Sequence, residues 1–213
     1  MKNTALLIAL LTIVLASCVK DRVTSTGTTV IPPVSTSGDS LICYYNCNID
    51  TLLILKNPTY FRFAGDSMGY AGSRYDTVQP GTTINAQGLD TVLSAGSAGL
   101  RLRNPSGDFT LALPTTGFKN IVLKYAVERS SKGAQTNTVM YTIDGTNYIS
   151  TAISSTSVYS VDTVWNLVSQ DFSSDPAVNN NPKFKVKISF SNASGTTTGN
   201  DRFDNITLWG IKQ

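Results

Sequence analysis

The stretch 183–190 alternates between two kinds of side chain, and this alternation constrains the fold more than any other feature of the chain. Its even positions are apolar, from Phe184 to Phe190, and its odd positions are three lysines and Ser189. Successive side chains of a strand point to opposite faces, so the pattern predicts a strand with one buried and one solvated face. The same period of two predicts strands at 99–103, 109–113, 121–128, 139–143 and 202–211.

Turn signals separate these segments, and no segment shows a sustained helical period. Asn104-Pro105-Ser106-Gly107 and Asp144-Gly145 are turn sequences, and the second one is a strong hairpin signal. Only 173–181 favours a turn of helix, because Asp175 precedes a proline that suits a first helical position. Many short, half-buried strands at spacings of about 8 to 20 residues predict an all-β fold, an antiparallel β-sandwich.

The N-terminus has the features of a secretory signal that ends at a lipid-attachment site. Lys2 precedes the apolar stretch 5–15, and small residues lead to Cys18. The pattern resembles the lipobox of bacterial lipoproteins, which implies cleavage after residue 17 and acylation of Cys18. An ordinary signal peptide is the alternative. The apolar stretch is shorter than the about 20 residues of a transmembrane helix. We therefore expect a lipid-anchored protein of the outer membrane, on its inner face or exposed at the cell surface.

The predicted organisation has three parts: a signal peptide over 1–17, a lipidated flexible tether over 18–40 and a β-sandwich domain over 41–213. The tether is rich in Ser, Thr, Gly, Pro and Val. Loss of the signal peptide removes Lys2, so the formal charge of the mature chain falls from +3 to +2. This near-neutral balance, with 15% charged residues, argues against a nucleic-acid partner. The membrane is expected to be contacted only through the lipid anchor.

The chain contains no histidine, and this absence excludes whole classes of active site. Ser-His-Asp and Cys-His catalysis and histidine-ligated zinc or iron sites all require that residue. A glycosidase needs only two carboxylates, and the chain has thirteen aspartates besides its single glutamate, Glu128. No spacing among them singles out a pair. We therefore expect no enzymatic activity, with a polysaccharide hydrolase or lyase as the least favoured alternative.

Cys43 and Cys47 are the two cysteines that remain after lipidation. An even number of cysteines in an exported protein favours a disulfide. In an extended strand their Cα atoms would lie about 13 Å apart, beyond the about 7 Å limit for a bridge. The predicted disulfide Cys43–Cys47 therefore needs a tight turn at Tyr44-Tyr45-Asn46. Half of a metal site is the alternative, although the other ligands are missing.

Six segments together resemble a jelly-roll domain of bacterial cell-surface and secreted proteins. This domain is similar to carbohydrate-binding modules and galactose-binding-like domains. The resemblance covers about 50–213 and implies a non-catalytic surface lipoprotein that binds glycan. A structural or adhesive domain with a protein partner, or with no small ligand, is the alternative. The segments that carry the resemblance are 100–104, 113–121, 141–145, 171–174, 180–184 and 202–206.

Planar hydrogen-bonding side chains and aromatic rings are the groups that a sugar site combines, and five residues supply them here. Guanidinium groups suit pairs of hydroxyls or carboxylates. Each of these residues also has a structural alternative. Glu128 can pair with an arginine across the sheet, and both tryptophans can belong to the core. The candidate ligand-binding residues are Arg101, Arg103, Glu128, Trp165 and Trp209.

Asp204 is the candidate metal ligand. The resemblance implies that an aspartate in the final strand binds a structural calcium ion, and 202–206 looks like that strand. Calcium takes six to eight oxygen ligands, so Asp204 needs partners, for which Asp50 and Asp66 are candidates. The alternative is that Asp204 caps a turn or pairs with an arginine. The three lysines of 183–190 are interpreted as a solvated strand edge, with an anionic polymer as the alternative ligand.

Overall fold

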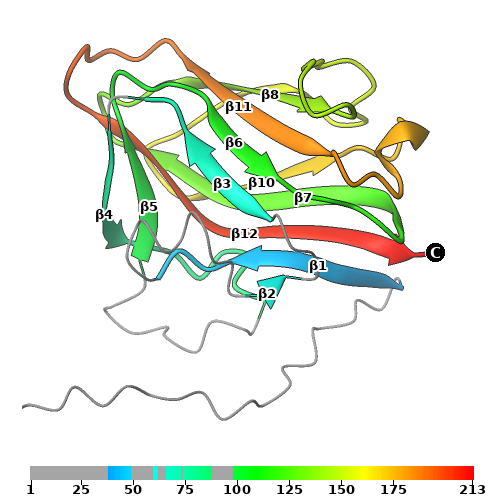
Figure 1. Ribbon diagram of the computed structural model, residues 1–213. Helices are drawn as coiled ribbons and strands as arrows, with labels where there is room; N and C mark the ends of the chain where they lie inside the picture. Colours follow the sequence, from blue (N-terminus) through cyan, green and yellow to red (C-terminus); the bar gives the residue numbers. More distant parts are fainter. Residues whose placement is uncertain (1–37, 49–59, 62–65, 73, 88–97) are drawn as a thin grey trace, which may run out of the picture. The chain divides into compact units, whose positions relative to one another are not determined.

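The computed structural model describes residues 38–48, 60–61, 66–72, 74–87 and 98–213, and all of them belong to one compact unit, Pro32–Gln213. Its regular structure consists of antiparallel strands in two sheets and one short 3₁₀ helix (Figure 1). The predicted β-sandwich is therefore confirmed. Among the described residues no helix is long and apolar enough to cross a bilayer. The signal peptide, Cys18 and most of the tether lie outside the described residues.

In the described part of the chain the larger sheet has seven strands, and the longest of them, β12, organises it. One side of β12 pairs with β7, while the other side pairs first with β5 and then with β1. Figure 1 shows β12 running between β7 and β1. The strands of this sheet are β10 (Asn166–Asp171), β7 (Phe118–Arg129), β12 (Asn200–Lys212), β1 (Asp39–Tyr45), β2 (Tyr60–Phe61), β5 (Ala98–Arg103) and β4 (Arg74–Pro80).

The described residues of the smaller sheet form five strands in the order β3-β6-β11-β8-β9. The strand predicted from 183–190 is β11, and it lies in the middle of this sheet rather than at an edge. The interpretation of its lysines as a protective edge is therefore wrong. The strands are β3 (Ser67–Tyr70), β6 (Phe109–Ala112), β11 (Lys185–Ser191), β8 (Thr136–Thr142) and β9 (Val158–Ser160).

The core lies between the two sheets, and the alternation in the sequence determines which residues enter it. Leu100, Leu102, Val186 and Ile188 are fully buried in one continuous cluster, as the period of two predicts. Aromatic rings fill its centre; the rings of Phe109 and Phe203 have centroids 5.0 Å apart.

The expected helical turn is also present. The 3₁₀ helix η1 (Pro176–Val178) has Asp175 as its N-cap, and the Asp175 side chain accepts a hydrogen bond from the backbone of Ala177 at 2.9 Å.

A second, smaller apolar cluster lies on the outer face of the larger sheet. It consists of Leu41, Tyr44 and Trp209, with Val122 packed against it. The register of β1 against β12 shifts between Leu41 and Cys43, so Ile42 and Cys43 both enter the main core. This bulge explains why two neighbouring residues share one face and why Leu41 and Tyr44 are left on the other.

Candidate functional site

Arg101, Arg202 and Glu128 lie in one row across the outer face of the larger sheet. The register places Arg101 of β5 opposite Arg202 of β12, and Arg202 opposite Glu128 of β7. Along their strands, Arg101 is followed by Leu102, Arg202 is followed by Phe203, and Glu128 is preceded by Val127. These three neighbours belong to the main core, so the period of two turns all three site residues outward. With Arg103, two residues after Arg101, they form what we call the arginine face.

Arg202 and Glu128 form an ion pair, with Arg202 Nη1 2.9 Å from Glu128 Oε1. The Glu128 residue is only 6% exposed although it lies on the outer face, so it does not protrude as a free acid. Burial raises the pKa of Glu128 above its usual range, and the positive charge of Arg202 opposes this rise. The cross-strand pairing that was the structural alternative for Glu128 is thus confirmed.

Trp165 reaches the same face from the loop before β10. A Cβ built on Gly99 of β5 would lie 3.0 Å from Cη2 of the indole, so the ring edge contacts Gly99. In the sheet order, β7 and β12 separate β10 from β5. The side chain of Trp165 therefore extends over these strands, on the same face as Arg101, Arg202 and Glu128.

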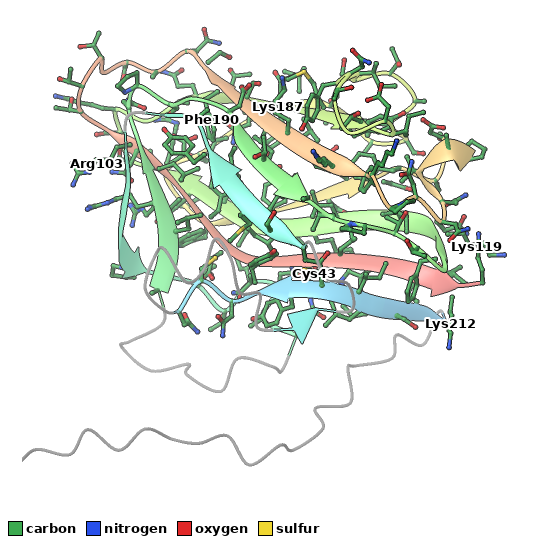
Figure 2. All side chains as sticks on the ribbon, in the orientation of Figure 1. Cys43, Arg103, Lys119, Lys187, Phe190 and Lys212 are labelled. Atoms are coloured by element: carbon green, nitrogen blue, oxygen red, sulfur yellow. The ribbon has the colours of Figure 1, made fainter. Side chains whose placement is uncertain are left out.

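Arg103 lies at the end of β5, where several hydrogen bonds fix the backbone. Its carbonyl accepts a hydrogen bond from the Tyr70 hydroxyl at 2.8 Å. The next residue, Asn104, is buried, and its side-chain Nδ2 donates hydrogen bonds to the carbonyl oxygens of Lys132 and Thr198 at 2.8 and 2.9 Å. Figure 2 shows Arg103 at this end of β5, away from Lys187 on the other sheet. These contacts hold the end of the strand against two loops and so position the arginine face.

Trp209 is a core residue and cannot act as an exposed platform. It lies on the outer face, out of phase with Leu208, but it is only 8% exposed. Its Nε1 donates to Thr207 Oγ1 at 3.0 Å. The site that was predicted around both tryptophans therefore retains only Trp165.

Asp204 has a structural function in the centre of β12. Its Oδ2 accepts from the backbone N–H of Thr82 at 2.8 Å, and its Oδ1 accepts from the backbone of Asn205 at 2.8 Å. The Asn205 amide in turn donates to the carbonyls of Thr82 and Ile84. The Asp204 carboxylate thus anchors the segment 81–87. This agrees with the alternative that Asp204 caps a turn.

The described residues do not assemble a calcium shell around Asp204. No group of three or more acidic, cysteine or histidine side chains with metal-binding geometry occurs in the described part of the chain. Asp66 is buried on the smaller sheet at the start of β3, while Asp50 lies outside the described residues. Calcium at Asp204 stays a prediction, and we assign it no part in binding.

The structure corrects the predicted disulfide, because Cys43 and Cys47 are both free thiols. Cys43 and Tyr45 belong to the extended strand β1, so the tight turn that a bridge requires does not form at Tyr44-Tyr45-Asn46. Both thiols are buried in the main core. Burial raises the pKa of each, and nearby carboxylates raise it further: Asp66 for Cys43 and Asp204 for Cys47.

The lysines of β11 lie on the outer face of the other sheet and are engaged there. Lys187 pairs with Asp108 at 3.4 Å and lies over the ring of Tyr148, 4.5 Å from its centroid. Lys185 Nζ donates to the carbonyl of Gly145 at 3.1 Å. This row is therefore separate from the arginine face.

Sequence reasoning missed two features, one on the arginine face and one beside the end of β7. Arg202 was not selected as a site residue, because its partner Glu128 comes from a strand more than seventy positions away. A polar cavity of about 520 Å³ opens beside the end of β7, and its lining comes from segments that are distant in the sequence. The lining residues are Arg129, Gln135, Thr136, Ser160, Val161, Asp162 and Asn166.

No protein-family model matches this sequence, and comparison with curated proteins finds no match either. Solved structures are similar in fold. The CBM22-1 xylan-binding domain from Paenibacillus barcinonensis Xyn10C has a TM-score of 0.51 at 11% identity, covering 83% of this chain and 97% of that domain. This chain has the β-sandwich fold of that domain.

Two further structures have lower similarity. The CBM22-1–GH10 modules of Clostridium thermocellum xylanase 10B, complexed with xylohexaose, give a TM-score of 0.47 at 12% identity, covering 79% of this chain and 28% of theirs. The K2 cleaved adhesin domain of Lys-gingipain gives 0.45 at 14% identity, covering 81% of this chain and 98% of that domain.

Proposed function

We propose that this protein is a non-catalytic lipoprotein that is anchored through Cys18 and binds glycan on the arginine face. The observation that carries the binding role is the position of Trp165, whose indole contacts Gly99 over the same face as Arg101 and Arg202. Sugar sites pair an apolar aromatic surface with a few oriented polar groups, because a sugar ring has an apolar face and a rim of hydroxyls.

The polar groups of this face are held in place by the sheet. Arg101 and Arg202 project from neighbouring strands in register, and Glu128 fixes the guanidinium of Arg202. A guanidinium offers several N–H donors in one plane, which matches adjacent hydroxyls or a carboxylate. Because the carboxylate of Glu128 is used within the sheet, we propose binding rather than hydrolysis.

The likeness in fold to a xylan-binding domain supports glycan as the first class of ligand to test. Individual contacts with hydroxyl groups exchange hydrogen bonds with water, and each nets only about 0.5 to 1.5 kcal/mol. We therefore expect weak binding that depends on several contacts and on the indole together.

A protein partner is the second candidate function, and exposed apolar side chains favour it. Val164 and Leu167, on either side of Trp165, are 59% and 52% exposed. Among the described strands, β10 is at an edge of the larger sheet, where a partner has access. A partner that used this edge would bury Leu167, so Leu167→Asp would abolish its binding and would affect a sugar much less.

The proposal is tested by screening the full-length protein on an array of neutral and anionic glycans, followed by calorimetry on each hit. Trp165→Ala should reduce binding at least about tenfold, since it removes the apolar surface. Lys185→Ala, on the opposite sheet, is the control and should bind like the wild type. Binding that survives Trp165→Ala unchanged, or an array without hits, would contradict glycan binding at this face.

A further inference from the structure

The polar cavity beside the end of β7 is lined by strands of both sheets. Arg129 of β7 and Asn166 of β10 reach it from the larger sheet, whereas Thr136 of β8 and Ser160 of β9 reach it from the smaller one. Its volume of about 520 Å³ falls within the range of small-molecule sites, about 300 to 1,000 Å³. The cavity is therefore large enough for a sugar ring.

The lining of this cavity is polar, and its charges cancel. Arg129 and Asp162 are the two charged residues of the lining, while its other polar side chains are carboxamides and hydroxyls. A lining without net charge that offers both donors and acceptors fits a neutral molecule with several hydroxyl groups better than it fits an ion.

Hydrogen bonds to the backbone fix three of these side chains and leave part of each one open. Arg129 Nε donates to the carbonyl of Val161 at 2.8 Å. Asp162 Oδ1 accepts from the backbone N–H of the next residue at 2.6 Å, and Asn166 Nδ2 donates to the carbonyl two residues before it at 2.9 Å. Neither Asp162 Oδ2 nor Asn166 Oδ1 accepts a hydrogen bond from another described residue, so both oxygens are acceptors for a ligand.

The cavity adjoins the arginine face through two pairs of chain neighbours. Asn166 follows Trp165, and Arg129 follows Glu128. Trp165 and Glu128 lie on the outer face, whereas Asn166 and Arg129 line the cavity. Because consecutive Cα atoms are only about 3.8 Å apart, a chain of a few sugar rings can contact both places at once.

We propose that this cavity is a second subsite, which holds a neutral sugar ring of the same glycan that contacts Trp165. This inference rests on the proposed function and adds the residues that recognise the next ring. The Asp162 carboxylate accepts from ring hydroxyls, and such charge-assisted hydrogen bonds are stronger than those between neutral groups. Because the side chains are already fixed, little conformational entropy is lost when the ring binds.

The inference is tested by calorimetry on the full-length protein with neutral oligosaccharides of xylose, glucose, galactose or mannose, one to six residues long. We expect the affinity for at least one series to rise about tenfold or more once the chain is long enough to contact both Trp165 and the cavity. In NMR spectra of the ¹⁵N-labelled protein, the side-chain amide signals of Gln135 and Asn166 should then shift.

Two variants remove the cavity without touching Trp165. Asp162→Asn keeps an oxygen for the backbone N–H but loses the charge, and Ser160→Tyr fills the cavity from an exposed position. Each should lower the affinity for the long oligosaccharides about tenfold and leave the short ones unaffected. Asp171→Asn is the matched control, because Asp171 at the other end of β10 also accepts a backbone N–H, from Ser173 at 2.8 Å. Thermal unfolding verifies that each variant is folded.

Binding that is lost in Trp165→Ala but unchanged in both cavity variants would overturn the second subsite and leave the proposed function standing. An equal loss in Asp171→Asn would also overturn the second subsite, because the effect would then not be specific to the cavity. If none of the four series binds to the wild type, the proposed function fails together with this inference.

Discussion

The Trp165 indole and Gly99 are in contact across the outer face of the larger sheet. A Cβ on Gly99 would lie 3.0 Å from Cη2 and 3.3 Å from Cζ2 of the ring, closer than side chains normally pack. The absence of a side chain at Gly99 thus allows the indole to lie against the sheet.

Replacing this glycine should therefore displace the ring. We expect Gly99→Val to weaken glycan binding by about tenfold, since the bulky side chain occupies the space of the indole. Tryptophan fluorescence should shift to longer wavelength as Trp165 becomes more hydrated. Ala112→Val, on the other sheet, is the control, and the prediction is wrong if both variants bind equally well.

The two tryptophans should behave oppositely when truncated. Trp209 is nearly buried and hydrogen-bonded, so Trp209→Ala should lower the free energy of unfolding by about 3 to 5 kcal/mol. Trp165→Ala should cost less than about 1.5 kcal/mol and should mainly reduce binding. Urea unfolding with calorimetric titration measures both quantities, and a larger loss of stability at Trp165 would contradict this assignment.

Asp201 should make stability depend on pH. Burial raises its pKa from 3.8 to about 7, opposed by the hydrogen bond from Ala134 and by the charge of Arg129. Because the folded state favours the protonated acid, the contribution of Asp201 to stability is full below about pH 4. This contribution should fall by up to about 4 kcal/mol as the pH rises to about 7. Asp201→Asn cannot ionise, so its urea midpoint should lack this fall; an unchanged pH profile would refute the assignment.

The two core thiols should be protected in the folded protein. Cys43 and Cys47 are about 1% exposed, and their pKa values are raised, so the reactive thiolate is scarce. We expect neither to react with iodoacetamide at pH 8 in native buffer and both to react in urea. A non-reduced digest containing a Cys43–Cys47 bridge would contradict the structure.

Cys18→Ala tests the proposed anchor. Acylation requires the Cys18 thiol, so the variant should leave the membrane fraction, whereas the wild type stays in it. Cys43→Ser serves as a control that removes a different cysteine. Complete partitioning of Cys18→Ala with membranes would show that the protein is held there by something other than this lipid.

The sequence by itself determined the faces of most strands. Leu100 and Leu102 point to the core while Arg101 and Arg103 point away, and η1 is capped by Asp175, because alternation and capping depend on residues a few positions apart. The predicted disulfide and the predicted Trp209 platform failed for tertiary reasons. Strand β1 stays extended through Cys43 and Tyr45, and packing on the outer face buries the Trp209 indole.

Only the tertiary structure decided which strands are neighbours. The alternation in 183–190 is the same for an edge strand as for the central strand β11. Likewise, no spacing in the sequence links Arg202 to Glu128 or Trp165 to Gly99. Side-chain direction is a local property of an extended backbone, whereas strand order follows from backbone hydrogen bonds and core packing over the whole chain. The sequence therefore indicated individual candidate residues, whereas only the fold showed which of them lie on one face of the sheet.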